Sequence, residues 1–252
     1  MRKLSVSSIG TYEKCPKNYH YRYIEKPEIE NVTWGFLEFG SCAHLVLENF
    51  HNHILEHGIG DGYGSIMKRS FESAIKEFNI DILRQPVWTP DGEKHGVRYL
   101  KEIMKEYLSM MIENGHPNVV GVETSFNKDL DGYIIRGFID RIDKVADGHY
   151  RVVDYKTSKN PKYLTPFQLC VYAIVVKDMY EDAEVISGSY SLLKHNFKTV
   201  DWNFSDDDIS RARDKIIRVG GYIENEDKWI KKPSTLCNWC DYKSICQPDS
   251  WI

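Results

Sequence analysis

The segment from Gly137 to Lys156 constrains the fold more than any other part of the chain. Two runs rich in β-branched residues flank the pair Asp147–Gly148, which is a strong signal for a β-hairpin. Side chains alternate between the two faces of a strand, so Asp154 and Lys156 share one face of the second run. Charged residues are rarely placed on an apolar strand unless they are paired, bind a metal or do chemistry. The segment therefore predicts either a surface hairpin whose charges meet water or a hairpin that carries a site.

The length of the loop decides which residue lies opposite Asp154. With a two-residue loop, Asp140 faces Tyr155. With a three-residue loop from Ala146 to Gly148, Asp140 faces Asp154. In the second register, two carboxylates and a lysine converge.

Composition sets broad limits on the class of protein. The chain has 252 residues, of which 42% are hydrophobic and 28% charged, as expected of one large globular domain with a substantial core or of one domain with a small appendage. It lacks an apolar stretch of membrane-spanning length and an N-terminal secretory signal. We therefore expect a cytoplasmic (intracellular) protein with no membrane partner, whose six cysteines are thiols or metal ligands. The net charge of −4 argues mildly against nucleic acid as a partner, but basic clusters after the hairpin leave that question open.

Apolar periodicity predicts alternating helices and strands, and hence an α/β fold. Gly40–Ser41 is expected to open a helix that Gly58 ends, and residues 85–94 are expected to form a loop. The other expected helices span residues 63–79, 96–114 and 167–180, and the expected strands span residues 119–126, 133–145, 150–157, 184–195 and 197–204.

Two helices carry polar pairs at a spacing of four, which places each pair on one helix face. His44 and Glu48 form the first pair. A lone histidine on such a helix is most often a hydrogen-bonded core residue, and the alternative is a metal ligand. Gln168 and Tyr172 form the second pair, either at the rim of a packed helix or in a site. His51, His53 and His57 match no motif and are expected to be exposed.

Three cysteines lie within ten residues near the C-terminus: Cys237, Cys240 and Cys246. In an intracellular protein such a group predicts metal ligation, and a tetrahedral metal or a cubane cluster needs a fourth thiolate. Cys42 adjoins the His44 helix and Cys170 lies within an apolar helix, which favours Cys15 as the fourth ligand. Structural zinc is an alternative that spacing leaves open, although a zinc ribbon more often has two C-x-x-C knuckles.

In combination these motifs resemble the PD-(D/E)XK nuclease superfamily, and in particular its RecB-like branch. Gly137-x-x-Asp140-Arg141 followed by Asp154-Tyr155-Lys156-Thr157 is similar to the catalytic core of that branch. Glu123 resembles an acidic residue that precedes this core, or it is an edge-strand glutamate. The first and last motifs of the branch resemble Gly40-x-x-x-His44-x-x-x-Glu48 and Gln168-x-x-x-Tyr172.

The resemblance implies a role for each matching residue. The metal ligands would be His44, Asp140, Asp154 and the carbonyl of Tyr155, holding Mg²⁺ or Mn²⁺. The catalytic set would be Asp140, Asp154, Lys156, Gln168 and Tyr172. The pattern of Cys15, Cys237, Cys240 and Cys246 is similar to the iron–sulfur members, including the CRISPR-associated RecB-like exonuclease family, and implies a 4Fe-4S cluster.

The implied fold is a restriction-endonuclease-like core with a central mixed β-sheet flanked by helices. The single domain would span residues 1–252, with a helical insertion at about 58–115 and the catalytic sheet and crossover helix at 116–204. The cluster would join residues 1–24 to residues 233–252.

The implied activity is that of a metal-dependent deoxyribonuclease, with a single-stranded DNA exonuclease as the first expectation. The rivals are a structure-specific endonuclease on the same core and a non-catalytic, cluster-bearing module that binds nucleic acid. DNA is the expected partner, with a helicase or recombination protein as a possible second. The sequence has no G-x-x-x-x-G-K-[ST] motif and so no ATPase motor of that kind.

Overall fold

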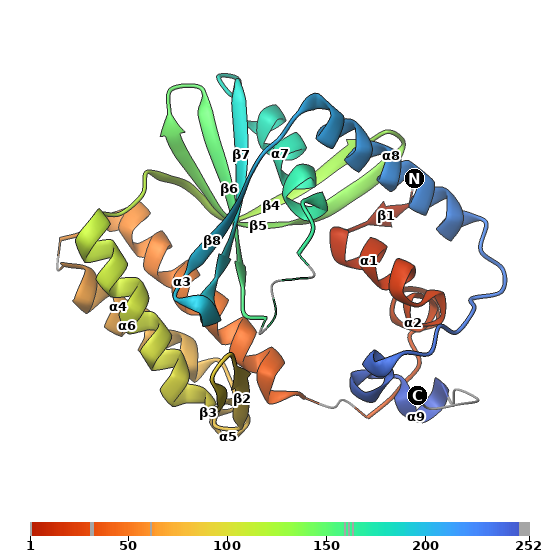
Figure 1. The fold of residues 1–252 in the computed structure, drawn as a ribbon, viewed down its shortest axis with the longest axis horizontal. Coiled ribbons are helices and arrows are strands. Elements are labelled where there is room, and N and C mark those ends of the chain that lie inside the picture. The colour runs from red at the N-terminus through yellow and green to blue at the C-terminus, as the bar shows by residue number, and fades with distance from the viewer. Residues whose placement is uncertain are drawn as a thin grey trace. The chain divides into compact units, whose positions relative to one another are not determined.

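The computed structural model describes residues 2–30, 33–60, 62–158, 160, 162 and 164–246. The chain divides into two compact units (Figure 1). The first unit comprises residues 1–32, 126–137 and 206–252, and the second comprises residues 33–125 and 138–205. Both hairpin strands that were predicted from the sequence are present, and the long strand β5 runs from the first unit into the second.

A mixed β-sheet forms the centre of the second unit. β4 pairs with β5, β5 is antiparallel to β6, β6 is parallel to β7, and β7 is antiparallel to β8. A parallel pair requires a crossover connection, and the buried apolar helix α7 supplies it between β6 and β7. The bounds are β4 Val119–Leu130, β5 Tyr133–Ala146, β6 His149–Lys156, α7 Phe167–Met179, β7 Val185–Leu192, a short 3-10 turn at Leu193–His195, and β8 Lys198–Asn203.

Three long helices pack against one another and cover the sheet within the second unit (Figure 1). They are α3 (Gly35–His57), α4 (Gly62–Lys76) and α6 (Gly96–Asn114). Their apolar stripes meet Val153 and Tyr155 of β6 in one continuous core. The expected bounds of α6 are confirmed. α3 begins five residues before the predicted start at Gly40, because Gly35 and Phe39 continue its buried stripe towards the N-terminus.

The expected loop at residues 85–94 is instead a short hairpin, and that prediction is wrong. After the one-turn helix α5 (Ile80–Leu83), strand β2 (Pro86–Thr89) pairs antiparallel with β3 (Gly92–His95). Two features specify it. Val87 is fully buried and anchors β2 in the core, and Gly92, at φ +119°, adopts a backbone conformation that other residues rarely take.

The first unit joins segments from both ends of the sequence. β1 (Lys3–Leu4) pairs in parallel with β5 at Ile134 and Ile135. The Tyr133 ring packs against Gly220 of α8 (Asp206–Glu224), where a side chain would collide with the ring. The remaining elements are α1 (Val6–Lys14), α2 (Pro16–Tyr19), a π-helical turn (His20–Glu25), α8 (Asp206–Glu224), a 3-10 turn (Thr235–Trp239) and α9 (Lys243–Cys246).

These elements confirm the expected α/β class, with a mixed central sheet flanked by helices. None of the helices in the described ranges combines the length and the apolar character needed to cross a membrane.

Candidate active site

The β5–β6 hairpin has the two-residue turn of the first alternative and the strand register of the second. The turn is the two-residue pair Asp147–Gly148, with Gly148 at φ +67°. Ala146 pairs with His149, but the register then shifts, so that Lys144 pairs with Tyr150 and Arg141 with Val153. An irregularity of this kind inserts an extra residue into one strand. One step further along the shifted register, Asp140 lies level with Asp154.

Asp140 is held by the neighbouring strand. Its Oδ2 accepts a hydrogen bond from the backbone N–H of Tyr155 at 2.7 Å. The same oxygen lies 3.4 Å from Nδ1 of His44 on α3. The side chain of Asp140 is only 12% exposed. One carboxylate oxygen therefore connects β5, β6 and α3.

α3 approaches the end of β6 closely enough to require a glycine at position 40. A Cβ built on Gly40 would lie 2.9 Å from Thr157 Oγ1 and 4.0 Å from Thr157 Cβ. His44 is one helical turn further along α3, so this contact sets how near His44 comes to Asp140.

We expect Gly40→Ala to lower stability and metal affinity, because the new methyl group overlaps Thr157 Oγ1. Such overpacking typically costs about 1–3 kcal/mol, which exceeds the gain of about 1 kcal/mol in helix propensity. Adding Thr157→Ala removes Oγ1 and should restore both properties. A double-mutant cycle read by thermal melting and Mn²⁺ titration tests this, and additive effects would refute the contact.

Glu123 joins His44 and Asp140, which makes it a stronger ligand candidate than the sequence indicated. One ligand atom from each of these three residues lies within 4.8 Å of the others. Glu123 reaches this place through a left-handed backbone conformation (φ 42°) within β4, uncommon for a residue with a side chain. Burial, followed by the carboxylates of Asp140, Glu48 and Asp154, raises the pKa of Glu123 to about 7. The alternative of a plain edge-strand glutamate does not account for this geometry.

Asp154 contacts two of the other predicted catalytic residues directly and a third through Gln168. Its Oδ2 lies 2.6 Å from Nζ of Lys156, and its Oδ1 accepts a hydrogen bond of 2.7 Å from Nε2 of Gln168. Gln168 Oε1 in turn accepts from Lys156 Nζ at 2.9 Å, and Gln168 Nε2 lies 2.7 Å from the hydroxyl of Tyr172. Gln168 and Tyr172 share one face of α7, as their spacing of four predicted, and α7 brings that face to the end of β6.

The carboxylates and the imidazole of this site are suitable ligands for a divalent cation. Asp154 is 2% exposed, and burial, followed by the charge of Asp140, raises its pKa to about 7 although Lys156 acts against this shift. Raised pKa values at both Glu123 and Asp154 indicate negative charge that Lys156 alone does not compensate. Carboxylate oxygens with one imidazole suit Mg²⁺ or Mn²⁺. His44, Glu123 and Asp140 would hold the ion, with Asp154 beside them, and the Tyr155 carbonyl stays a predicted ligand.

The expectation that His51 is exposed is wrong. Its side chain is 1% exposed, because it lies on the buried stripe of α3 between Leu47 and Ile54. That spacing of four and three residues was the available signal. Burial, followed by the charges of Arg141 and His116, holds the pKa of His51 well below its ordinary value.

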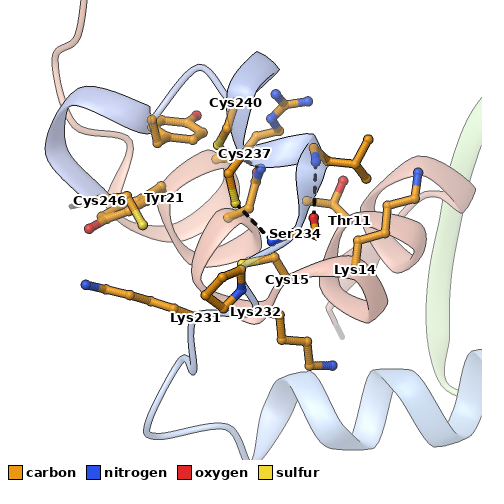
Figure 2. A pocket seen from close by; sticks show the side chains of 15 residues that line it. Thr11, Lys14, Cys15, Tyr21, Lys231, Lys232, Ser234, Cys237, Cys240 and Cys246 are labelled. Carbon is orange, nitrogen blue, oxygen red and sulfur yellow. Dashed lines mark hydrogen bonds between the residues drawn. The ribbon is translucent and has the colours of Figure 1, made fainter. Parts of the chain in front are cut away.

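A second candidate site lies within the first unit, where four cysteines line one pocket (Figure 2). Cys15 comes from the junction of α1 and α2, while Cys237, Cys240 and Cys246 come from the C-terminal turn and α9. The pocket holds about 140 Å³. Cys42 and Cys170 are buried in the second unit, as their apolar helices predicted.

The two ends of the chain are tied together around this pocket. Asn18 Nδ2 donates to Cys240 Sγ at 3.4 Å, and the backbone N–H of Ser234 donates to Cys237 Sγ at 3.4 Å. Arg22 forms an ion pair with Asp241 at 2.5 Å. Burial first, and then neighbouring cysteines, raises the pKa values of Cys240 and Cys246. Crowded thiols of this kind are stabilised as thiolates by a bound cation.

The mixed sheet and the acidic hairpin site are consistent with a nuclease, and comparison with known proteins identifies the family. The family model described as the PD-(D/E)XK nuclease superfamily matches residues 3–247, and the chain belongs to that superfamily. The central sheet and flanking helices of this chain are consistent with a restriction-endonuclease-like core.

Several individual proteins are similar to the chain. Gene 69 protein of Mycobacterium phage L5 is 25% identical, covering 96% of this chain and 95% of the phage protein. One subunit of an ATP-dependent helicase/deoxyribonuclease from Streptococcus pyogenes is 25% identical over 70% of this chain, which corresponds to 17% of the streptococcal protein. A solved structure from Eubacterium rectale, named "Putative exonuclease", has a TM-score of 0.51 at 16% identity and covers 94% of this chain and 92% of its own.

Proposed function

We propose that the protein is a metal-dependent deoxyribonuclease that degrades single-stranded DNA from an end. The observation that carries the proposal is the convergence of Glu123, Asp140 and Asp154 with His44 and Lys156 at the end of one hairpin. Membership of a nuclease superfamily supports the hydrolysis of phosphodiester bonds. The deoxyribonuclease name of the streptococcal relative supports DNA as the substrate.

Each side chain has a part that follows from its position. A bound Mg²⁺ or Mn²⁺ supplies a Lewis acid at the scissile phosphate and lowers the pKa of water. Lys156 is oriented by both Asp154 and Gln168, so its ammonium group is held in place to position the attacking water or to stabilise negative charge on the phosphate. Gln168 cannot turn without breaking bonds to Asp154, Lys156 and Tyr172, which fixes the geometry of the set.

The choice of an exonuclease over an endonuclease rests on likeness to other proteins. The Eubacterium rectale structure, which shares the fold of this chain, carries an exonuclease name. The streptococcal relative is one subunit of a helicase/deoxyribonuclease, and the matched part is 17% of it. A helicase or recombination protein is accordingly the partner that we propose for this chain.

The test uses end-labelled linear and circular single-stranded DNA of the same sequence, incubated with Mn²⁺ or with a chelator. We expect the linear strand to shorten only with metal and the circle to stay intact. Cleavage of the circle would assign an endonuclease on the same core. Intact DNA of both forms with Mg²⁺ and with Mn²⁺ would refute the proposal and favour a non-catalytic module.

His44→Ala distinguishes ligation from packing. If His44 holds the ion, its removal should weaken Mn²⁺ binding by more than about tenfold, and excess Mn²⁺ should partly restore activity. If His44 only packs, the melting temperature should fall while the Mn²⁺ concentration that supports half-maximal activity stays unchanged. Isothermal titration and activity at several Mn²⁺ concentrations separate the two.

We also propose that Cys15, Cys237, Cys240 and Cys246 hold a 4Fe-4S cluster. The four thiols line one pocket of about 140 Å³, which supports a shared metal group. The resemblance of their pattern to the iron–sulfur RecB-like nucleases favours the cluster, and zinc is the alternative outcome.

A further inference from the structure

A buried polar network lies behind the catalytic hairpin, and the predicted catalytic set leaves it without a role. Asp140 and Arg141 are neighbours on β5, so their side chains leave opposite faces of the strand. On the far face, Arg141 lies among Tyr155 of β6, Tyr107 of α6 and His51 of α3. Its side chain is only 12% exposed.

Arg141 forms the centre of this network. Its Nη1 donates to the phenol oxygens of Tyr107 at 2.8 Å and Tyr155 at 2.7 Å. Its Nη2 donates to Asp143 Oδ2 at 2.9 Å, and its Nε lies 2.9 Å from Asp143 Oδ1. Asp143 is itself 6% exposed. The planar, always charged guanidinium therefore fixes three side chains at once.

The donors and acceptors form a consistent chain. A guanidinium only donates, so each phenol oxygen accepts from Arg141 and has its own proton left to donate. The nearest acceptor is Nε2 of His51, which lies 2.7 Å from Tyr107 and 3.1 Å from Tyr155. Its one lone pair accepts the proton of the nearer Tyr107, and the hydroxyl of Tyr155 donates to the Tyr107 oxygen at 3.3 Å. A neutral His51 that accepts at Nε2 carries its proton on Nδ1 and donates it to His116 Nε2 at 2.9 Å.

Tyr155 links this network to the candidate metal site. Its phenol is held by Arg141, while its backbone N–H holds Asp140 Oδ2 at 2.7 Å. The ring of Tyr155 also meets the His44 ring edge to face, at 6.0 Å between centroids. A shift of Tyr155 therefore moves groups that contact both Asp140 and His44.

We propose that Arg141 is a positioning residue, which clamps the phenol of Tyr155 and thereby sets the placement of Asp140 and His44 for the metal ion. The inference rests on the proposed function in so far as a metal binds there. The proposal also gives a role to helix α6, which lies in the region between residues 58 and 115. Its Tyr107 accepts a hydrogen bond from the same Nη1 of Arg141 that holds Tyr155. Outer partners of metal ligands typically change affinity or activity by about 10–100-fold when removed.

A purely structural network would behave differently. Removing Arg141 itself would leave Asp143 buried without a cation, so that variant would unfold for reasons unrelated to positioning. Tyr155→Phe is the sharper change, because it deletes one oxygen and keeps the ring. Tyr150→Phe is its matched control. Tyr150 lies on the same strand, is 3% exposed, and loses one phenol hydrogen bond of 2.7 Å to Asp182.

The experiment measures Mn²⁺ affinity by titration calorimetry, amide hydrogen exchange at residues 154–156 without metal, and melting temperature. Tyr155→Phe should weaken Mn²⁺ binding about 10–100-fold and speed exchange at these amides. Tyr150→Phe should lower the melting temperature by a comparable amount and change neither other property. Tyr107→Phe should resemble Tyr155→Phe.

Equal exchange at residues 154–156 in the Tyr155 and Tyr150 variants would overturn the proposal, as would Mn²⁺ affinity within about twofold of the wild type in Tyr155→Phe. The exchange measurement needs no metal. If the wild-type protein bound no Mn²⁺ and cut no DNA, the proposed function would fail, and exchange alone would still decide whether Arg141 positions this strand.

Discussion

Replacing Asp154 by asparagine is expected to abolish DNA cleavage and to raise the stability of the metal-free protein. Loss of activity should exceed about a hundredfold, the upper end of the effect for outer partners of metal ligands, because Asp154 lies among the groups expected to act on the metal and on Lys156. Asparagine keeps an oxygen for Gln168 to donate to. It removes a charge that burial and Asp140 make unfavourable, so the chelated variant should melt at a higher temperature at pH 8.

The pH dependence of that gain has a definite sign. The pKa of Asp154 rises from 3.8 to about 7 in the folded protein, so ionisation of Asp154 lowers the stability of the wild type as pH rises from about 4 to about 7, and the asparagine variant lacks this contribution. The difference in melting temperature should be absent near pH 4 and complete above about pH 7. Thermal melts in chelator across this range measure it.

Asp182→Asn is the matched control for this experiment. Asp182 also accepts from a lysine, Lys144 at 2.7 Å, but it is exposed and its pKa is lowered by hydrogen bonds from Lys144 and Tyr150. Its removal should lower stability slightly and leave cleavage intact. If Asp154→Asn also lowers stability in the absence of metal, its pairing with Lys156 outweighs the burial cost and the argument for uncompensated charge is wrong.

The parts of the site that the sequence predicted are those encoded by local patterns. The Asp147–Gly148 turn, strand alternation and the i, i+4 spacing of Gln168 and Tyr172 place their side chains by rules that need no tertiary information. The fold class and most element bounds follow from the same patterns. The register of Asp140 against Asp154 was one of two alternatives, because an irregularity between Lys144 and Ala146 shifts the pairing without a sequence signature.

The features that escaped prediction depend on tertiary contacts. The role of Glu123 was left open between a site residue and an edge-strand glutamate, because the left-handed backbone that brings it to the site has no signal in the residue type. The network around Arg141 joins residues from four separate elements, so neither Tyr107 nor His51 could be assigned from its own neighbours in sequence. The β2–β3 hairpin was predicted to be a loop because its strands are too short to show alternation.

Changing Cys15 to serine is expected to remove the proposed cluster as completely as changing Cys240. Purified without oxygen, the wild-type protein should be brown, with about four iron and four sulfide ions per chain, as one cubane on four thiolates requires. Loss of one of four ligands leaves an iron without its thiolate, so both variants should be colourless or retain far less iron. Absorbance and metal analysis on matched preparations measure this.

The same change should loosen both ends of the chain together. The contact between Asn18 and Cys240 spans 222 positions in the sequence. The conformational entropy lost in closing so long a loop must be offset by the interactions that join its ends. Weak N–H···S bonds and the Arg22–Asp241 pair would remain to join the ends in Cys15→Ser. Limited trypsin digestion should therefore release terminal fragments while the second unit resists.

Cys42→Ser is the control: it places a hydroxyl in a fully buried position and lowers stability, but it should keep the colour and the protected ends. One zinc per chain in a colourless wild type would replace the cluster while keeping the four ligands. Full metal content in Cys15→Ser would remove Cys15 from the ligand set.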